Sequence, residues 1–428
     1  MYFLGIAFFL LVLSYVYDVW HYRKNKAIWE IIALAVLILF AGLKYHLGGD
    51  NYSYLHYFYD EYPSLDAYTW KDFGVGKDPL YALLNSFVRD LGGRFYMVQL
   101  IHASILNFLL FKYIKRHSRY VFTCLFFYFI TCFFHYNAEI LRASLSIVIC
   151  LFGNDYIKQN KWLKGYLLYG IALFCHAQTL LMFLLPVLFR MRLDTKGFIV
   201  LGLAFVLSYS LQSVLNNYLF LLDNMSDLQN RAQIYIESET YGSGSTSLGG
   251  LIVYLTPIIY ILASYFIQEQ TDKTRALEEI EPFIFPGLLF TVLSYNMPIF
   301  YRFTDYYRIY FVILYAYLFV LVSTGGIELF KRHRVRFKGY KLDDEGNRVA
   351  VRGYKTWVKK YRVTMKYRGY RMLNSVACFL PFFIILAISI TDKTSYIRYF
   401  PYTNVISKQI VAEREYMFND EGVKETDY

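Results

Sequence analysis

The segment YLLYGIALFCHAQTLLMFLLPVLF, residues 166–189, decides the fold class of this chain. It is an apolar run of membrane-spanning length, which predicts α-helix because backbone polar groups in hydrocarbon must pair internally. Lys164 and Arg190 flank it, and basic residues collect on the cytoplasmic side of a membrane. A single crossing would break that rule. The segment therefore predicts either a broken, re-entrant pair of half-helices with His176 near its tip, or one short loop that departs from the charge rule.

Similar runs occur along the whole chain of 428 residues, of which 57% are hydrophobic. They predict an all-α, polytopic integral membrane protein, a single membrane domain over 1–428 with about 10–12 transmembrane helices. The first twenty residues have no basic start and no small-residue cleavage site, so we expect a retained helix rather than a signal peptide. The apolar segments lie near 1–19, 28–43, 95–111, 120–135, 138–157, 165–189, 198–222, 248–267, 283–299, 302–324 and 373–391.

The net charge of +11 would suggest nucleic acid in a soluble protein. Here the excess lies in short loops and in 325–372, so the positive-inside rule explains it and no nucleic-acid partner is expected. The same rule predicts that the N-terminus and the loops 44–94 and 223–247 face the outside. The five cysteines lie in apolar segments without metal-type spacing, so we expect free thiols.

Three loops have features of their own. The outer loop 44–94 contains a short amphipathic helix near 78–91, with Asp78 as its cap and Pro79 in its first turn. The outer loop 223–247 ends in a flexible Gly/Ser stretch. The segment 325–372 is a basic cytoplasmic loop for which β-prone runs around Asp-Glu-Gly-Asn suggest a hairpin. It either sets the topology or binds anionic lipid headgroups.

Charged residues inside apolar segments are candidates for function because burying them in a membrane is costly. Arg142 lies in HYNAEILRASLSIVIC, three residues after Glu139, so the two could pair on one helix face. Arg302 lies in MPIFYRFTDYYRIYFVIL, where Asp305 could neutralise it and Tyr306 follows. Either arginine could instead bind an anionic ligand, because a guanidinium fork matches phosphate oxygens.

Two further stretches carry polar residues. His176 is followed by Gln178 in LFCHAQTLL, and histidine suits proton transfer near neutral pH. The alternative for His176 is a buried structural donor. The stretch GLKYHLGGDNYSYLHYFYD, residues 42–60, places its polar groups directly after an apolar run, with two glycines that allow a sharp turn. Its candidate residues are Lys44, Asp50, Tyr52 and Tyr54, and the turn would bring Lys44 and Asp50 near Arg142.

Several motifs are absent from the sequence. There is no phosphate-binding loop, no acidic cluster for a nucleotide-sugar metal, no nucleophile elbow and no zinc spacing. We therefore expect no cofactor and no metal, and a reaction on a substrate that carries its own activated group.

The chain resembles the EpsG-type family of Wzy-like bacterial polysaccharide polymerases. The stretch 42–60 is similar to that family's signature after an early membrane helix, and DPLYALLN, EILRASLSI, LFCHAQTLL, YRFTDYYRIYF and YFPYTNVI resemble later motifs in the same order. Lys44 stands where the family usually has Arg, Ala143 where Gln usually follows the Arg, and Ala177 and Gln178 where Pro and Ser follow the His.

The resemblance implies a metal-independent, multi-pass glycosyltransferase of the bacterial inner membrane. Its substrate would be oligosaccharide units on undecaprenyl pyrophosphate, with membrane lipids, a chain-length regulator and a flippase as further partners. Arg142 and Arg302 would hold the pyrophosphate, assisted by Lys44, and His176 would be the base, with Asp50 and Glu139 as rivals. Tyr52, Tyr54, Asp305, Tyr306 and Gln178 would bind substrate. The alternatives are a flippase for the same lipid-linked sugar and a membrane glycan ligase or related transferase.

Overall fold

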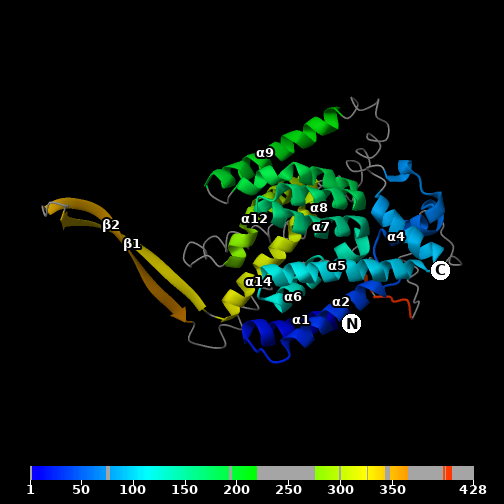
Figure 1. Ribbon diagram of the computed structural model, residues 1–428, viewed down its shortest axis with the longest axis horizontal. Helices are drawn as coiled ribbons and strands as arrows, with labels where there is room; N and C mark the ends of the chain where they lie inside the picture. Colours follow the sequence, from blue (N-terminus) through cyan, green and yellow to red (C-terminus); the bar gives the residue numbers. More distant parts are fainter. Residues whose placement is uncertain are drawn as a thin grey trace.

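The structure, a computed structural model, describes residues 2–73, 78–191, 195–218, 275–297, 300–324, 326–342, 348–364, 399–400 and 402–406. Over these residues the chain forms a helical body from which one β-hairpin extends (Figure 1). The predicted helical class is confirmed for the body, and the hairpin is the exception. The segment 223–247 lies outside the described residues.

The elements follow one another in short steps. Up to residue 139 they are α1 (Tyr2–Leu13), η1 (Ser14–Val19), α2 (Lys26–Gly42), α3 (Asn51–His56), η2 (Tyr57–Glu61), η3 (Leu65–Ala67), η4 (Trp70–Phe73), α4 (Pro79–Asp90), α5 (Phe95–His117), α6 (Val121–Thr131) and η5 (His135–Glu139). After it they are α7 (Leu141–Lys158), α8 (Trp162–Cys175), η6 (Ala177–Phe183), η7 (Leu185–Arg190), α9 (Thr195–Tyr218), α12 (Arg275–Ser294), α13 (Tyr301–Thr304), η10 (Asp305–Tyr307), α14 (Arg308–Thr324), β1 (Gly326–Leu342) and β2 (Arg348–Thr364).

The described helices differ in how much of a membrane they could cross. Two are both long and apolar enough to span it, Tyr2–Val19 and Phe95–His117. Four more are apolar but shorter, Val121–Thr131, Trp162–Cys175, Lys196–Tyr209 and Ile280–Ser294. An apolar helix in hydrocarbon satisfies its own backbone, so this composition is consistent with a membrane protein.

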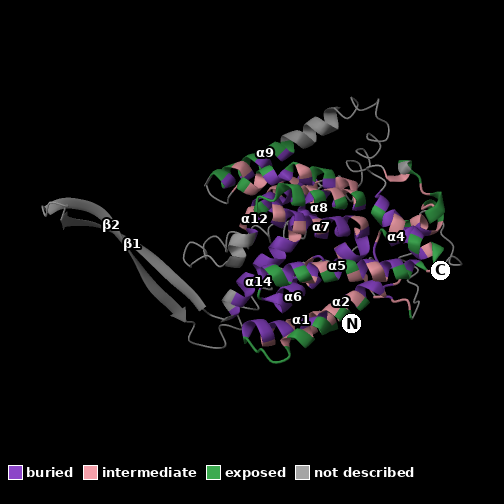
Figure 2. Ribbon diagram, in the orientation of Figure 1, coloured by how far each residue is buried: buried purple, intermediate pink, exposed green. Residues whose placement is uncertain are grey.

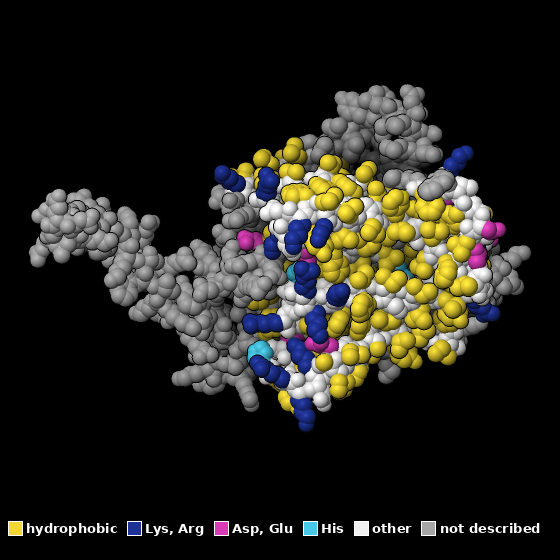
Figure 3. Space-filling view, viewed as in Figure 1, with side chains coloured by type: hydrophobic (Ala, Val, Ile, Leu, Met, Phe, Trp, Pro, Cys, Tyr) yellow, Lys and Arg dark blue, Asp and Glu magenta, His cyan; other side chains and the backbone are white. Residues whose placement is uncertain are grey.

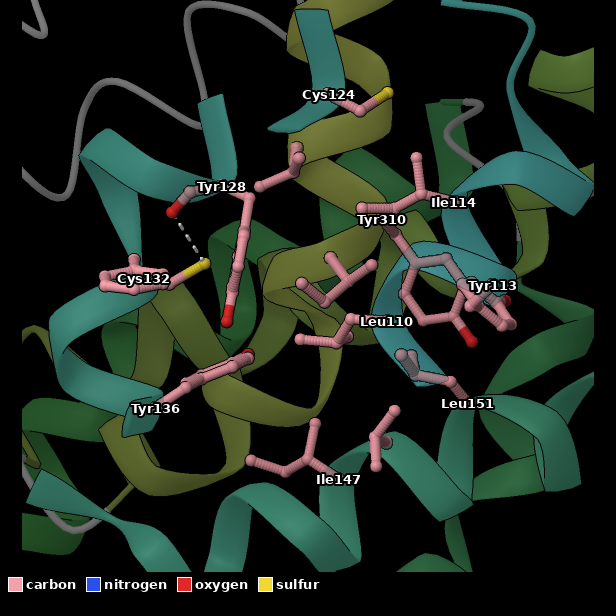
Figure 4. Close-up of a cluster of buried hydrophobic side chains, with 14 of the residues drawn as sticks. Leu110, Tyr113, Ile114, Cys124, Tyr128, Cys132, Tyr136, Ile147, Leu151 and Tyr310 are labelled. Atoms are coloured by element: carbon pink, nitrogen blue, oxygen red, sulfur yellow. Dashed lines mark hydrogen bonds between the residues drawn. The ribbon is translucent and has the colours of Figure 1, made fainter. Parts of the chain in front are cut away.

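The core of the body surrounds α14. Its residues from Ile309 to Val320 are all buried, so this helix is enclosed on every side, as its uniformly apolar sequence requires (Figure 2). Tyrosines lie inside the core where a hydrogen-bond partner is available. Tyr310 accepts a hydrogen bond from Asn154 at 2.9 Å, and its ring meets that of Tyr113 edge-on (Figure 4).

The surface separates apolar from basic side chains. Exposed apolar residues cover the outer faces of α2, α5 and α8, including Ile31, Phe108 and Leu167. Figure 3 shows most of the Lys and Arg side chains gathered along one edge of this face. At that edge the start of α2 meets the end of α5, because Lys115 pairs with Glu30 at 2.6 Å. The opposite ends of these helices carry the polar groups described below.

The helix break predicted within 165–189 is present. The α8 helix ends at Cys175, and His176 has an extended backbone with φ −160° and ψ 127°. The tighter η6 and η7 segments continue the chain. The break turns the polar groups after Cys175 toward neighbouring elements.

A hairpin of two long strands follows α14 (Figure 1). β1 pairs antiparallel with β2 in a register that runs from Gly326 opposite Thr364 to Leu342 opposite Arg348. It lies in the basic segment 325–372, in which the sequence suggests a hairpin. The strands are 17 residues each, longer than the short runs seen in the sequence.

The last described residues, 402–406, lie against the stretch that follows α2. Tyr45 N donates to Thr403 O at 3.0 Å, and Val405 N donates to Leu43 O at 3.0 Å. The Tyr402 hydroxyl donates to Phe40 O at 2.8 Å. These contacts join segments some 360 residues apart and hold the residues after α2 in place.

Candidate functional site

Three segments bring a carboxylate, a guanidinium and an imidazole together. Arg142 Nη1 in the first turn of α7 donates to Asp78 Oδ2 at 2.9 Å. His176 Nδ1, at the break after α8, lies 3.3 Å from the same oxygen. The backbone N of Ala177 donates to Asp78 Oδ1 at 3.1 Å. Asp78 is buried, whereas the Arg142 side chain is 31% exposed and can reach a ligand.

The predicted role of Asp78 as a helix cap is wrong. Its side chain makes no capping hydrogen bond to α4, because both carboxylate oxygens bind Arg142, His176 and Ala177. Only its carbonyl accepts from the first turn of the helix. Its backbone has φ 48°, a left-handed conformation that non-glycine residues adopt at a cost and that concentrates at functional sites. Asp78 is therefore held for its carboxylate.

Tyrosine rings surround the Arg142 guanidinium. The ring centroids of Tyr54 and Tyr57 lie 5.7 and 5.6 Å from its central carbon. Both distances allow cation–π attraction. Burial raises the pKa of the Tyr54 and Tyr62 hydroxyls, and Arg142 partly offsets that rise. These phenols therefore stay protonated and can act as hydrogen-bond donors at neutral pH.

The predicted pairing of Glu139 with Arg142 is wrong. Glu139 ends the π-helical turn η5, and Ile140 separates it from α7, so the two side chains do not share one α-helical face. Glu139 Oε1 instead accepts from Gly49 N at 3.0 Å, and its carbonyl accepts from the Tyr54 hydroxyl at 3.1 Å. Glu139 thus holds the turn after α2 against α7.

That turn depends on Gly48, and we expect Gly48→Ala to destabilise the protein by about 1–3 kcal/mol. Its φ is +104°, and an added Cβ would lie 2.7 Å from Ala138 O. The measurement is the thermal unfolding midpoint of purified protein in detergent. Gly170→Ala is the matched control, since nothing lies within 4 Å of its Cβ position in α8. Equal midpoints for both variants would contradict the strain at Gly48.

A second charged cluster lies at the start of the last helix of the body. Arg308 Nε pairs with Asp305 Oδ1 at 2.6 Å, and His135 Nε2 lies 3.0 Å from Asp305 Oδ2. Tyr136 donates to Asp305 O at 2.5 Å. The partners that hold Asp305 are thus Arg308 and His135, while Arg302, the neutralising partner considered above, is half-buried nearby.

A hydroxyl chain connects the two clusters. Ser146, one turn after Arg142, hydrogen-bonds Thr179, and the Tyr306 hydroxyl lies 3.3 Å from Ser146 and 3.2 Å from Thr179. Tyr306 adjoins Asp305 in η10. The predicted residues Arg142, His176, Asp305 and Tyr306 therefore belong to one continuous polar region at the end of the body opposite the basic edge.

We expect Asp305→Asn to cost about 3–5 kcal/mol of stability, because it leaves the Arg308 cation buried without its carboxylate. The double variant Asp305→Asn/Arg308→Met should recover most of that loss, as thermal unfolding in detergent would measure. Asp60→Asn is the control: its carboxylate also binds a histidine but is 59% exposed, so less than about 1 kcal/mol is expected. A double variant as unstable as the single one would show that the pair is not the cause.

The other predicted residues lie around this region or apart from it. Asp50 is exposed at the start of α3, within electrostatic reach of Tyr54. Gln178 is half-buried in η6, and the Tyr52 hydroxyl lies 3.2 Å from His46 Nδ1. Lys44 lies in a separate pocket with Arg94 and is not among the groups that contact Arg142.

The residues that sequence reasoning missed are Asp78 as a site residue, His135, Arg308, Ser146 and Thr179. Asp78 precedes a proline and looks like an ordinary cap, and His135 lies among aromatics with no charged neighbour along the chain. A signal did exist for Asp78, since it begins the DPLYALLN motif. For His135 the partner is 170 residues away.

Comparison with known proteins identifies the family. The model of the EpsG family matches residues 27–326, well over half of the chain, which confirms the resemblance seen in the motifs. Searches of curated proteins and of solved structures gave no match. The matched range includes Arg142, Asp78, His176 and Asp305. This protein is a member of the EpsG family, which associates it with polysaccharide biosynthesis and with a membrane.

Proposed function

We propose that this protein is a polysaccharide polymerase. It joins oligosaccharide units carried on undecaprenyl pyrophosphate at the outer face of the bacterial inner membrane, which the chain crosses about 10–12 times. Family membership supports a polymerase-like function. The observation that carries the proposal is the contact of Arg142 and His176 with one buried carboxylate, Asp78, at the end of the body opposite the basic edge.

The proposed step is a glycosyl transfer. The hydroxyl of the acceptor sugar gives its proton to His176 as its oxygen forms a bond to the anomeric carbon of the donor. The bond between that carbon and the pyrophosphate oxygen breaks, and the lipid pyrophosphate leaves with the electron pair. One glycosidic bond forms as one sugar–phosphate bond breaks, so no external oxidant or reductant is needed.

The described residues supply what each part of this step requires. Asp78 orients His176 and the Arg142 side chain together. Arg142 and Arg302 stabilise the charge that develops on the leaving pyrophosphate, as preorganised cations do in a site of low dielectric. The tyrosines around Arg142 provide aromatic faces and hydroxyl donors for sugar rings. Expected partners are membrane lipids, a flippase that supplies the units and a chain-length regulator.

A glycan-length gel tests the proposal. The gene is deleted in its host and then complemented with wild type at matched membrane levels. A polymerase leaves single glycan units on the surface after deletion, and wild type restores a ladder of longer chains. If deletion instead removes surface units while lipid-linked units accumulate inside, the protein is a transporter and the proposal is wrong.

A further inference from the structure

A second pocket lies apart from the Asp78 site, and α3 with η2 separates the two. Tyr54 and Tyr57 of this segment face Arg142, whereas Asn51, Leu55 and Tyr59, spaced four residues apart, line the second pocket. Residues four apart lie on one face of a helix. The pocket encloses about 460 Å³, within the range of small-molecule sites. The same short segment thus contributes to both sites.

The pocket combines a buried cation with an exposed one. Lys44 is only 2% exposed, and its ammonium nitrogen has one hydrogen-bond partner among the described residues, Ala41 O at 3.3 Å. None of the ion pairs among these residues includes it. Arg94 lies exposed at the start of α5 and also lines the pocket. A buried amine without a carboxylate is costly unless an anion from outside joins it.

The remaining lining has the chemistry of a sugar site. Gln99 donates from Nε2 to Asn51 at 3.0 Å, but its buried Oε1 has no hydrogen-bond partner among the described residues. That oxygen can accept a hydrogen bond from a hydroxyl group. The rings of Tyr45, Tyr59 and Tyr96 supply the aromatic surface on which sugars lie. Two cations, a free amide acceptor and three tyrosines fit a sugar better than a bare phosphate.

We propose that this pocket binds an acidic sugar, a hexuronate or similar saccharide whose carboxylate meets Lys44 and Arg94. The inference rests on the proposed function, and it adds that the polymerised unit contains such an acidic sugar. The carboxylate takes the place of the missing partner of Lys44, and a ring hydroxyl donates to Gln99 Oε1. Because α3 and η2 line both sites, sugar bound here would extend toward Arg142.

Binding should depend on pH through Lys44. Burial lowers the pKa of the Lys44 ammonium group to about 7, so it loses its proton as the pH rises above neutrality. Affinity for an anion should therefore fall by up to about tenfold for each pH unit above 7. The titratable or charged groups around Lys44 are His46, Tyr45 and Tyr59 from the segment after α2, and Arg94, Tyr96 and His102 from α5.

Calorimetric titration of the purified protein in detergent, with glucuronate and glucose as a matched pair of probes, tests the proposal. The two sugars differ at one carbon, a carboxylate in one and a hydroxymethyl group in the other. We expect glucuronate to bind at least tenfold more tightly than glucose at pH 6.5. Lys44→Met should remove that preference. Arg94→Gln, an exposed change that leaves the core intact, should reduce it severalfold, and the exposed control Lys161→Met should leave it unchanged.

Two results would overturn the proposal. Equal binding of the two sugars, or a preference that survives Lys44→Met, would show that the pocket does not recognise a carboxylate. Binding of inorganic phosphate or glycerol phosphate without glucuronate would assign the pocket to a lipid headgroup instead. Arg142→Ala should keep the preference for glucuronate, so binding without a glycan ladder would reject the polymerase alone. A ladder without binding would reject only the acidic-sugar pocket.

Discussion

Replacing Arg142 with alanine is expected to leave only single-unit glycan on the gel described above. Arg142 is the cation nearest His176, and its loss should lower the rate of polymerisation about 10²–10³-fold, the effect of removing one group that stabilises transition-state charge. The rate is measured as glycan chains formed on lipid-linked substrate in membranes with matched amounts of protein. Arg116→Ala, at the basic edge where its side chain is 52% exposed, is the control and should keep the wild-type rate.

Arg142→Ala also has a structural cost that must be separated from its effect on the reaction. It leaves the Asp78 carboxylate buried without its cation, which costs about 3–5 kcal/mol. The double variant Arg142→Ala/Asp78→Asn removes that charge and should restore the amount of folded protein without restoring the ladder. Arg142→Lys keeps the charge but loses the planar fork, so we expect partial activity. A double variant that regained long chains would show that Arg142 acts only on folding.

Replacing His176 with alanine should lower the rate about 10²–10⁴-fold, the usual contribution of a positioned general base. His176 Nδ1 lies beside Asp78, which leaves Nε2 for the acceptor hydroxyl. Neither rival base has this geometry. Glu139 is engaged by the backbone of Gly49, and Asp50 is exposed at the start of α3.

His135→Ala is the matched control for His176, because His135 also lies 3.0 Å from a buried carboxylate, that of Asp305. We expect it to destabilise the second cluster but to change the rate per folded molecule less than tenfold. Thermal unfolding in detergent gives the folded fraction against which each rate is normalised. If His135→Ala lost the rate and His176→Ala kept it, the base would lie in the second cluster and the assigned roles would be reversed.

Much of the site could be predicted from local residue types. Arg142, His176 and Arg302 stand out because a charged or polar residue inside an apolar run is visible without any knowledge of its neighbours. The tertiary structure changed how these residues are paired. Arg142 binds Asp78, 64 residues away, rather than Glu139, and Lys44 lies in a pocket of its own.

The apolar runs along the chain were enough to predict a helical body, and the helix break near His176, because both follow from each segment's own composition and flanking charges. Only the tertiary structure decided which charges meet, since His176 joins Asp78 across 98 residues and His135 joins Asp305 across 170. A helix forms from contacts within a few residues, whereas an ion pair between helices depends on how the helices pack. That packing is set by the whole buried core, which no single stretch of sequence contains.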